Sequence, residues 1–188
     1  IADESADPKY VAADLLSQAE HDRLASSVLL TTSQGLATRV DAEIIRQTSY
    51  LGRSEIIAAS LRDFGCAIVC RDLKQAAELA NEVAPEHLEI VTEDPRSLLP
   101  DIQNAGAVFL GAWSPEPLGD YLAGPDHVLP TSGTARFFSP LSVDSFLKTM
   151  SVVEFSRETL APIREEIVTM AEAEHLTAHA NSIRVRFE

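Results

Sequence analysis

Five histidines are the residues of this chain best able to move protons or bind a metal. Four of them directly follow an acidic residue, in the pairs Glu20-His21, Glu86-His87, Asp126-His127 and Glu174-His175, and the fifth is His179. A carboxylate that contacts an imidazole orients the ring and raises its pKa. Neighbours in the sequence need not touch in space, and a chain with 29 acidic residues contains such pairs by chance. Each pair taken alone therefore favours a structural role.

Two other pairs have the spacing that places side chains on one face of a helix. Gln18 and His21 are three residues apart near the end of a predicted helix. Imidazole is a common zinc ligand and a glutamine oxygen is an unusual one, so this spacing alone favours a solvated helix end. His175 and His179 are four apart, as in helical zinc pairs, but the catalytic glutamate of a metalloprotease motif does not lie between them.

Glu86 and His87 follow Pro85, which disfavours helical geometry at Ala84 and so helps to end the preceding predicted helix. The pair therefore stands at a bend, where two adjacent side chains can face one cavity. In a regular strand they would point to opposite faces. At a bend they can supply a general base and a carboxylate that activates water. An exposed turn is the alternative that these residues leave open.

The segment 119–130, Gly-Asp-Tyr-Leu-Ala-Gly-Pro-Asp-His-Val-Leu-Pro, follows a predicted strand. Open α/β sheets bind their ligands at the carboxyl ends of the strands. Glycines and prolines give this segment an irregular backbone that can present Asp120 and His127 to a bound molecule. Residues 112–135 as a whole show no clear periodicity, and a connection of that length is usually functional.

The elements that must position these residues alternate between helices and short β-branched strands. Asp7 and Pro8 are typical of a helix start, and that helix runs to about His21. Further helices are predicted at 34–64 with a break near Gly52, and at 72–83, 95–104, 156–174 and 175–182. Strands are predicted at 27–31, 67–69, 88–91, 107–110 and 183–187, and the opening residues resemble the tail of another strand. This alternation predicts an α/β fold, a parallel sheet with helices on both faces.

Composition excludes several classes of function. The formal net charge is -14 and no cluster of lysine or arginine interrupts it, so binding to nucleic acid is not expected. No apolar run is long enough to span a membrane. The glycines form neither a dinucleotide fingerprint nor a phosphate loop, and no nucleophile elbow is present. Cys66 and Cys70 are predicted to be buried and too far apart for a disulfide, which fits a reducing cytoplasm.

Six segments, in order along the chain, resemble the histidinol dehydrogenase family. The first three are Asp-Leu-Leu-Ser-Gln-Ala-Glu-His (14–21), Pro-Glu-His-Leu (85–88) and Val-Phe-Leu-Gly-Ala-Trp-Ser-Pro-Glu (108–116). The others are Gly-Asp-Tyr (119–121), Asp-His-Val-Leu-Pro-Thr (126–131) and Ala-Glu-His-Leu-Thr-Ala-His (173–179). Any one of them is weak evidence, whereas six in family order with family-like spacing are specific.

The resemblance implies a zinc enzyme that oxidises L-histidinol to L-histidine through the aldehyde, with two NAD and one water. Its general base would be His87, and the carboxylate that activates water would be Glu86. The implied zinc ligands, which also contact the substrate, are Gln18, His21, Asp120 and His179. Two further positions implied to bind the substrate are His127 and Glu174. His175 matches no ligand position and is expected at the surface.

The resemblance also implies an assembly. In the family, the last metal ligand comes from the partner subunit of a homodimer, so His179 and Glu174 would act across the interface. Residues 1–135 would form an incomplete Rossmann-like sheet flanked by helices, with most of the site. Residues 136–188 would form a small, mainly helical dimerisation unit.

The front of the chain departs from the family pattern. The family's NAD-binding domain precedes the point at which this sequence begins, so NAD would be bound mainly outside it, and these residues alone are expected to be inactive. A related zinc and NAD enzyme for another polyol or a sulfonated alcohol is one alternative. A non-catalytic zinc-binding dimerisation fragment is the other.

Overall fold

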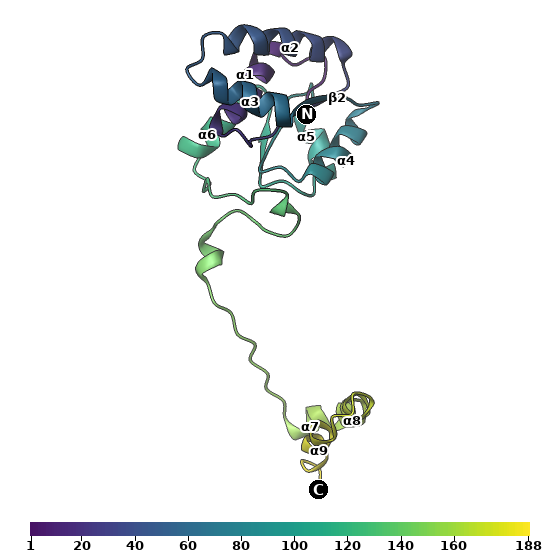
Figure 1. Ribbon diagram of the computed structural model, residues 1–188. Helices are drawn as coiled ribbons and strands as arrows, with labels where there is room; N and C mark the ends of the chain where they lie inside the picture. Colours follow the sequence, from purple (N-terminus) through teal and green to yellow (C-terminus); the bar gives the residue numbers. More distant parts are fainter. The chain divides into compact units, whose positions relative to one another are not determined.

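A computed structural model describes all 188 residues and divides them into two compact units, residues 1–146 and 147–188. The boundary follows Phe146, eleven residues beyond the predicted one at residue 135. Figure 1 shows both units in sequence colours, from purple at the amino terminus to yellow at the carboxyl terminus.

Four strands form two parallel pairs in the first unit. Strand β1 (Ser27–Thr31) pairs with β2 (Gly65–Val69), and β3 (His87–Ile90) pairs with β4 (Ala107–Leu110). Ala2 forms parallel bridges to both Thr31 and Val91, so the opening residues join the two sheets. This confirms that the chain opens in strand-like geometry, and it makes the first unit a mixed α/β structure with parallel strands.

Helix α1 (Pro8–His21) begins where local chemistry predicts. The carboxylate of Asp7 accepts a hydrogen bond from the Lys9 N–H, and Pro8 occupies the first helical position. The buried face of α1 consists of Val11, Ala12, Leu16 and Ala19. Because this face packs inward, the polar residues of the last turn, Gln18 and His21, remain available for other contacts.

The other helices of the first unit surround the strands. They are α2 (Gln34–Thr48), α3 (Ser54–Phe64), α4 (Leu73–Val83), α5 (Pro95–Leu98) and α6 (Glu116–Tyr121), with 3-10 helices η1 (Leu99–Asp101), η2 (Thr134–Arg136) and η3 (Val143–Phe146). The predicted break near Gly52 is confirmed between α2 and α3. The predicted helix 95–104 is shorter, because its regular part stops at Asp101.

Alternate residues of β1 pack on opposite faces, which places helices on both sides. Leu29 packs in a cluster with residues of α1 and α2, whereas Leu30 packs in a second cluster with α4 and β3. Helix α1 contacts both α2 and α3, and the three helices lie together in Figure 1. The predicted covering of both faces is therefore confirmed for β1.

The second unit begins with residues 147–156, which form no helix or strand, and continues with short helices. They are α7 (Arg157–Leu160), the 3-10 helix η4 (Ala161–Ile163), α8 (Arg164–Ala173) and α9 (Thr177–Arg184). Its small core is formed by Val168 and Ala171 of α8 with Ala180 and Ile183 of α9. The predicted strand at 183–187 is wrong: Ile183 and Arg184 continue α9, because Ile183 packs on the helix core and no neighbouring strand is present to pair with.

Two further predictions need correction. Cys70 is buried but Cys66 is exposed, because the side chains of β2 after Gly65 lie at the surface. The predicted irregular stretch 112–135 contains the helix α6, which carries Asp120. No helix of the structure is long and apolar enough to cross a membrane.

Candidate active site

His87 is the first residue of β3, and the bend before it is fixed by β4. Helix α4 ends at Val83, and the next residue, Ala84, has a left-handed φ of 50°, so the chain turns sharply before Pro85. The carbonyl oxygen of Glu86 then accepts the Ala107 N–H at 2.9 Å. A side chain at Gly106 would place its Cβ 2.6 Å from that carbonyl oxygen, so only glycine permits this approach. The predicted bend at Glu86 and His87 is confirmed.

Helix α6 supplies the acidic side chains opposite His87. It follows β4 after a short turn and packs closely on that strand, since a Cβ at Gly119 would lie 2.8 Å from the Phe109 ring. Glu116 stands at its first position and Asp120 one turn later, so their side chains share a face. The face is held towards α1, where the Ser17 hydroxyl lies 3.4 Å from Glu116 Oε2.

The side chains of His87, Glu116 and Asp120 form one cluster. One potential ligand atom from each lies within 4.8 Å of the others. His87 Nε2 is 3.7 Å from Glu116 Oε1, too long for a hydrogen bond. Imidazole nitrogen and carboxylate oxygen are ligands that zinc accepts, so this donor set fits a divalent metal.

Burial favours the neutral form of the His87 imidazole. Burial lowers the pKa of its imidazole, against the raising effect of the charges on Glu86 and Asp120. Its Nδ1 is buried without a hydrogen-bond partner, which leaves Nε2 as the nitrogen that faces the carboxylates. A neutral ring is able to accept a proton near pH 7.

The carboxyl groups beside His87 hold protons more tightly than usual. Burial, with the neighbouring charge and hydrogen bond of Asp120, raises the pKa of Glu116 to about 7. Burial, with the charge and hydrogen bond of Asp14, raises the pKa of Glu89 to about 8. Perturbed acids gathered beside a perturbed histidine are typical of functional sites.

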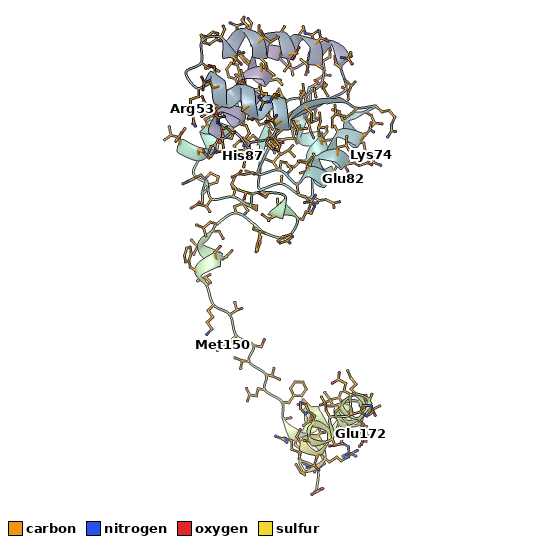
Figure 2. The ribbon with its side chains drawn as sticks, in the orientation of Figure 1. Arg53, Lys74, Glu82, His87, Met150 and Glu172 are labelled. Carbon is orange, nitrogen blue, oxygen red and sulfur yellow. The ribbon has the colours of Figure 1, made fainter.

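A cavity of about 500 Å³ borders this cluster, a size common for small-molecule sites. Its polar lining comes from α1, from the bend before β3, from β3 itself and from α6, and includes Asp14, Gln18, Glu86, His87, Glu89 and Glu116. Figure 2 labels His87 among the side chains of the first unit.

Most of the predicted site residues of the first unit gather here. Gln18 and Glu86 line the cavity with His87, and Asp120 belongs to the cluster. His21 is exposed at the end of α1, yet it is close enough for its charge to oppose protonation of His87. The geometry thus brings these predicted residues into one region.

The remaining predicted residues lie elsewhere. His127 is exposed in the loop after α6, and no hydrogen bond or ion pair joins it to the cluster. Glu174 ends α8 and His179 lies on α9, both exposed and both in the second unit. His175 is exposed as expected, with a left-handed φ of 61°.

Sequence reasoning gave no role to Glu116, Glu89 or Asp14. A signal for Glu89 was present, because an acidic residue inside the apolar run of β3 is rarely buried without a partner. Glu116 stands at a helix start directly after a strand and its turn, which is also a favoured place for a ligand-binding acid. Nothing in the spacing of Asp14 distinguishes it from other polar residues of α1.

Comparison with known proteins decides the family. The sequence model described as histidinol dehydrogenase matches residues 1–187. The chain belongs to the histidinol dehydrogenase family. It is 66% identical to a histidinol dehydrogenase of Caldanaerobacter subterraneus over 187 residues, and 57% identical to one of Clostridium acetobutylicum over 188 residues.

Solved structures agree with this membership of the histidinol dehydrogenase family. The crystal structure of histidinol dehydrogenase from Elizabethkingia anophelis superposes with a TM-score of 0.90 and 38% sequence identity, covering 99% of this chain and 43% of that one. Each of the two curated relatives above is matched over 100% of this chain and 44% of its own length. The chain therefore spans less than half the length of its relatives.

Proposed function

We propose that this chain is the metal-binding and acid–base part of an enzyme that oxidises L-histidinol to L-histidine, using two NAD and one water. The observation that carries the proposal is the half-buried His87, whose pKa burial lowers, facing Glu116 and Asp120 beside a cavity in a chain of the histidinol dehydrogenase family. NAD would be bound mainly by polypeptide outside residues 1–188, with these strands forming part of a larger Rossmann-like sheet.

His87 is proposed as the general base of both oxidation steps. In the first step the alcohol of the substrate loses a hydride to NAD and a proton to His87 Nε2, which gives the aldehyde. Burial supports this role, because it keeps the ring neutral and thus able to accept that proton. The nearby carboxylates then stabilise the charged ring that forms.

Glu86 is proposed as the group that activates water for the second step. Its carboxylate removes a proton as the water oxygen bonds to the aldehyde carbon, and the former carbonyl oxygen takes up that proton, which gives a hydrated aldehyde. That hydrate loses a second hydride to NAD and a proton to the protein, which gives the carboxylic acid. Support comes from the position of Glu86, since it lines the same cavity as His87 at a bend fixed by Gly106.

Zinc is the metal proposed for the site, held by Gln18, His21 and Asp120 with His179 of the partner subunit. When bound, zinc would anchor the substrate, and hydride transfer would belong to the nicotinamide. Support comes from the convergence of α1 and α6 on one cavity, which Gln18 lines, and from Asp120, the one proposed ligand that belongs to the cluster beside it. His127 is proposed to bind the substrate from its own loop, and Glu174 from the partner subunit.

The second unit is proposed as a dimerisation element. Its opening residues expose large apolar side chains, including Met150, Val152 and Phe155, and Phe146 just before them is exposed as well. A contiguous stretch of this kind is typical of a surface that another chain covers. A homodimer would cover it and would bring Glu174 and His179 to the site of the partner.

A segment-swapped enzyme tests the proposed function. In it, residues 1–188 of this chain replace the matching segment of the Caldanaerobacter subterraneus relative, which is 66% identical. With zinc and NAD we expect L-histidinol to be consumed with two NADH formed per molecule of L-histidine. Turnover of a sulfonated diol without turnover of L-histidinol would contradict the proposal, as would zinc binding with no turnover at all.

A further inference from the structure

Glu89 connects the three elements that carry the site. It lies on β3 two residues after His87, so the two side chains leave the strand on the same face, whereas Leu88 and Ile90 pack in the core. Its Oε1 accepts the backbone N–H of Glu116, the first residue of α6, at 2.8 Å. Its carboxyl group is also hydrogen-bonded to Asp14 of α1.

The first turn of α6 needs this contact. A helix leaves its first N–H groups without partners inside the helix. Here Pro115 and Pro117 have no N–H, and the Leu118 N–H is bonded to the Pro115 carbonyl at 3.0 Å. The residue before the helix, Pro115, supplies no side-chain cap. Among these first groups, the Glu116 N–H is therefore the one donor without a backbone partner, and the Glu89 carboxyl group accepts its hydrogen bond.

We propose that Glu89 is a positioning residue whose carboxyl group holds α6 against β3 and α1, so that Asp120 stays within reach of His87. A six-residue helix is too short to be stable without contacts to the rest of the fold. The other contacts that place it are the packing of Gly119 on Phe109 and the long Ser17–Glu116 hydrogen bond. Glu89 thus acts through α6 and does not touch the reacting atoms.

Two substitutions separate this role from simple stability. Glu89→Gln keeps an oxygen that can accept the Glu116 N–H, and its amide can donate to Asp14. Glu89→Met has a similar volume but no acceptor of comparable strength. A residue needed only for stability would change the melting temperature of the Met variant, while the folded molecules would keep the same zinc affinity and the same kcat.

The experiment measures the zinc affinity and the steady-state kinetics of both variants in the segment-swapped enzyme. The kinetic measurement rests on the proposed function, since it uses L-histidinol as the substrate. We expect Glu89→Gln to stay within about twofold of wild type in both zinc Kd and kcat. Glu89→Met should weaken zinc binding about tenfold or more and lower kcat to a similar extent, as supporting contacts of metal ligands do. A Met variant equal to wild type overturns the proposal, and so does a Gln variant as impaired as the Met variant.

Hydrogen exchange at single-amide resolution in the wild-type enzyme tests the same contact without a substitution. The Glu116 N–H should exchange at least about tenfold more slowly than an exposed amide, because its only partner is the half-buried Glu89 carboxyl group. Rapid exchange would contradict the proposal even if Glu89→Met failed to fold. If the wild-type enzyme did not oxidise L-histidinol, the proposed function would be wrong. The zinc Kd of the variants and the exchange rate of the Glu116 amide would still test the positioning role of Glu89.

Discussion

The two units hold their chemically active residues in opposite ways. In the first unit, His87, Glu89 and Glu116 are half-buried, and their proton affinities are shifted by burial and by one another. In the second unit, Glu174 and His179 are exposed, and neither side chain has a hydrogen-bond or ion-pair partner. The first unit therefore sets the chemistry of its groups through its own packing. In the second unit, the proton and metal affinities of Glu174 and His179 depend on the protein surface that these side chains contact.

Substitution of His87 should have the largest effect on activity. In the segment-swapped enzyme, His87→Ala removes the proposed base, and kcat should fall about 10²–10⁴-fold. His87→Asn is the matched polar control and should lose as much, because an amide cannot take up the proton. Zinc content, measured by mass spectrometry of metals, should stay at the wild-type level. Turnover by either variant at the wild-type rate would contradict the role of His87.

Substitution of His179 tests whether the second unit serves another chain. His179→Ala should weaken zinc binding at least about tenfold, since even supporting residues of metal sites cost that much. Coexpressed in equal amounts, His87→Ala and His179→Ala subunits should recover about a quarter of wild-type activity, because half of the dimers then contain one intact site. No recovery in a mixture shown to contain heterodimers would mean that His179 serves its own chain.

Gly106 tests how firmly the bend at Glu86 is held. Gly106→Ala places a Cβ against the Glu86 carbonyl oxygen, which is backbone and cannot move aside cheaply. We expect a loss of about 1–3 kcal/mol in the free energy of unfolding, measured by chemical denaturation. Gly52→Ala is the matched control, because nothing lies within 4 Å of its added Cβ. Equal stability of the two variants would show that the bend is loosely packed.

The raised pKa of Glu89 predicts a smaller, pH-dependent effect. The folded state keeps the proton of Glu89 up to a pKa of about 8, whereas the unfolded chain releases it near the ordinary value of 4.5. Stability should therefore fall as pH rises from about 4.5 to 8, by at most about 1.4 kcal/mol per pH unit for one proton. The Gln side chain of Glu89→Gln cannot titrate. The free energy of unfolding of this variant relative to wild type should therefore increase across this pH range and level off above it. A difference in unfolding free energy between wild type and Glu89→Gln that does not change with pH would contradict the raised pKa of Glu89.

Local signals predicted most of the fold. Asp7 and Pro8 correctly predicted the start of α1. The β-branched and apolar runs correctly predicted β1 and β4, including the residues at which they begin and end. The segment 183–187 was wrongly predicted to be a strand. Its alternation of apolar and polar residues is also compatible with a helix end, and contacts with residues distant in sequence decide between the two. The burial of Cys66 was wrongly predicted for the same reason. Most side chains of β2 are exposed, and the composition of a strand alone does not reveal which of its side chains the rest of the fold covers.

The site was predictable only in part. Pro85 located the bend that carries Glu86 and His87, and family resemblance singled out Gln18, His21 and Asp120. The contacts of Glu116 and Glu89 join α1, β3 and α6 across as many as 99 residues, and no local pattern encodes them. The proton affinities of these carboxyl groups arise from burial and mutual repulsion, which exist only after folding.

The most direct test of the site is an NMR pH titration of the His87 imidazole in the folded, metal-free chain, assigned with the His87→Asn variant. Burial should place its pKa below the ordinary value of 6.5, so that the ring is neutral near pH 7. A pKa at or above 6.5 would show that the carboxylates dominate over burial. A pKa well above 7 would leave the ring mostly protonated near pH 7, and the proposed base would then not exist in the form that the mechanism requires.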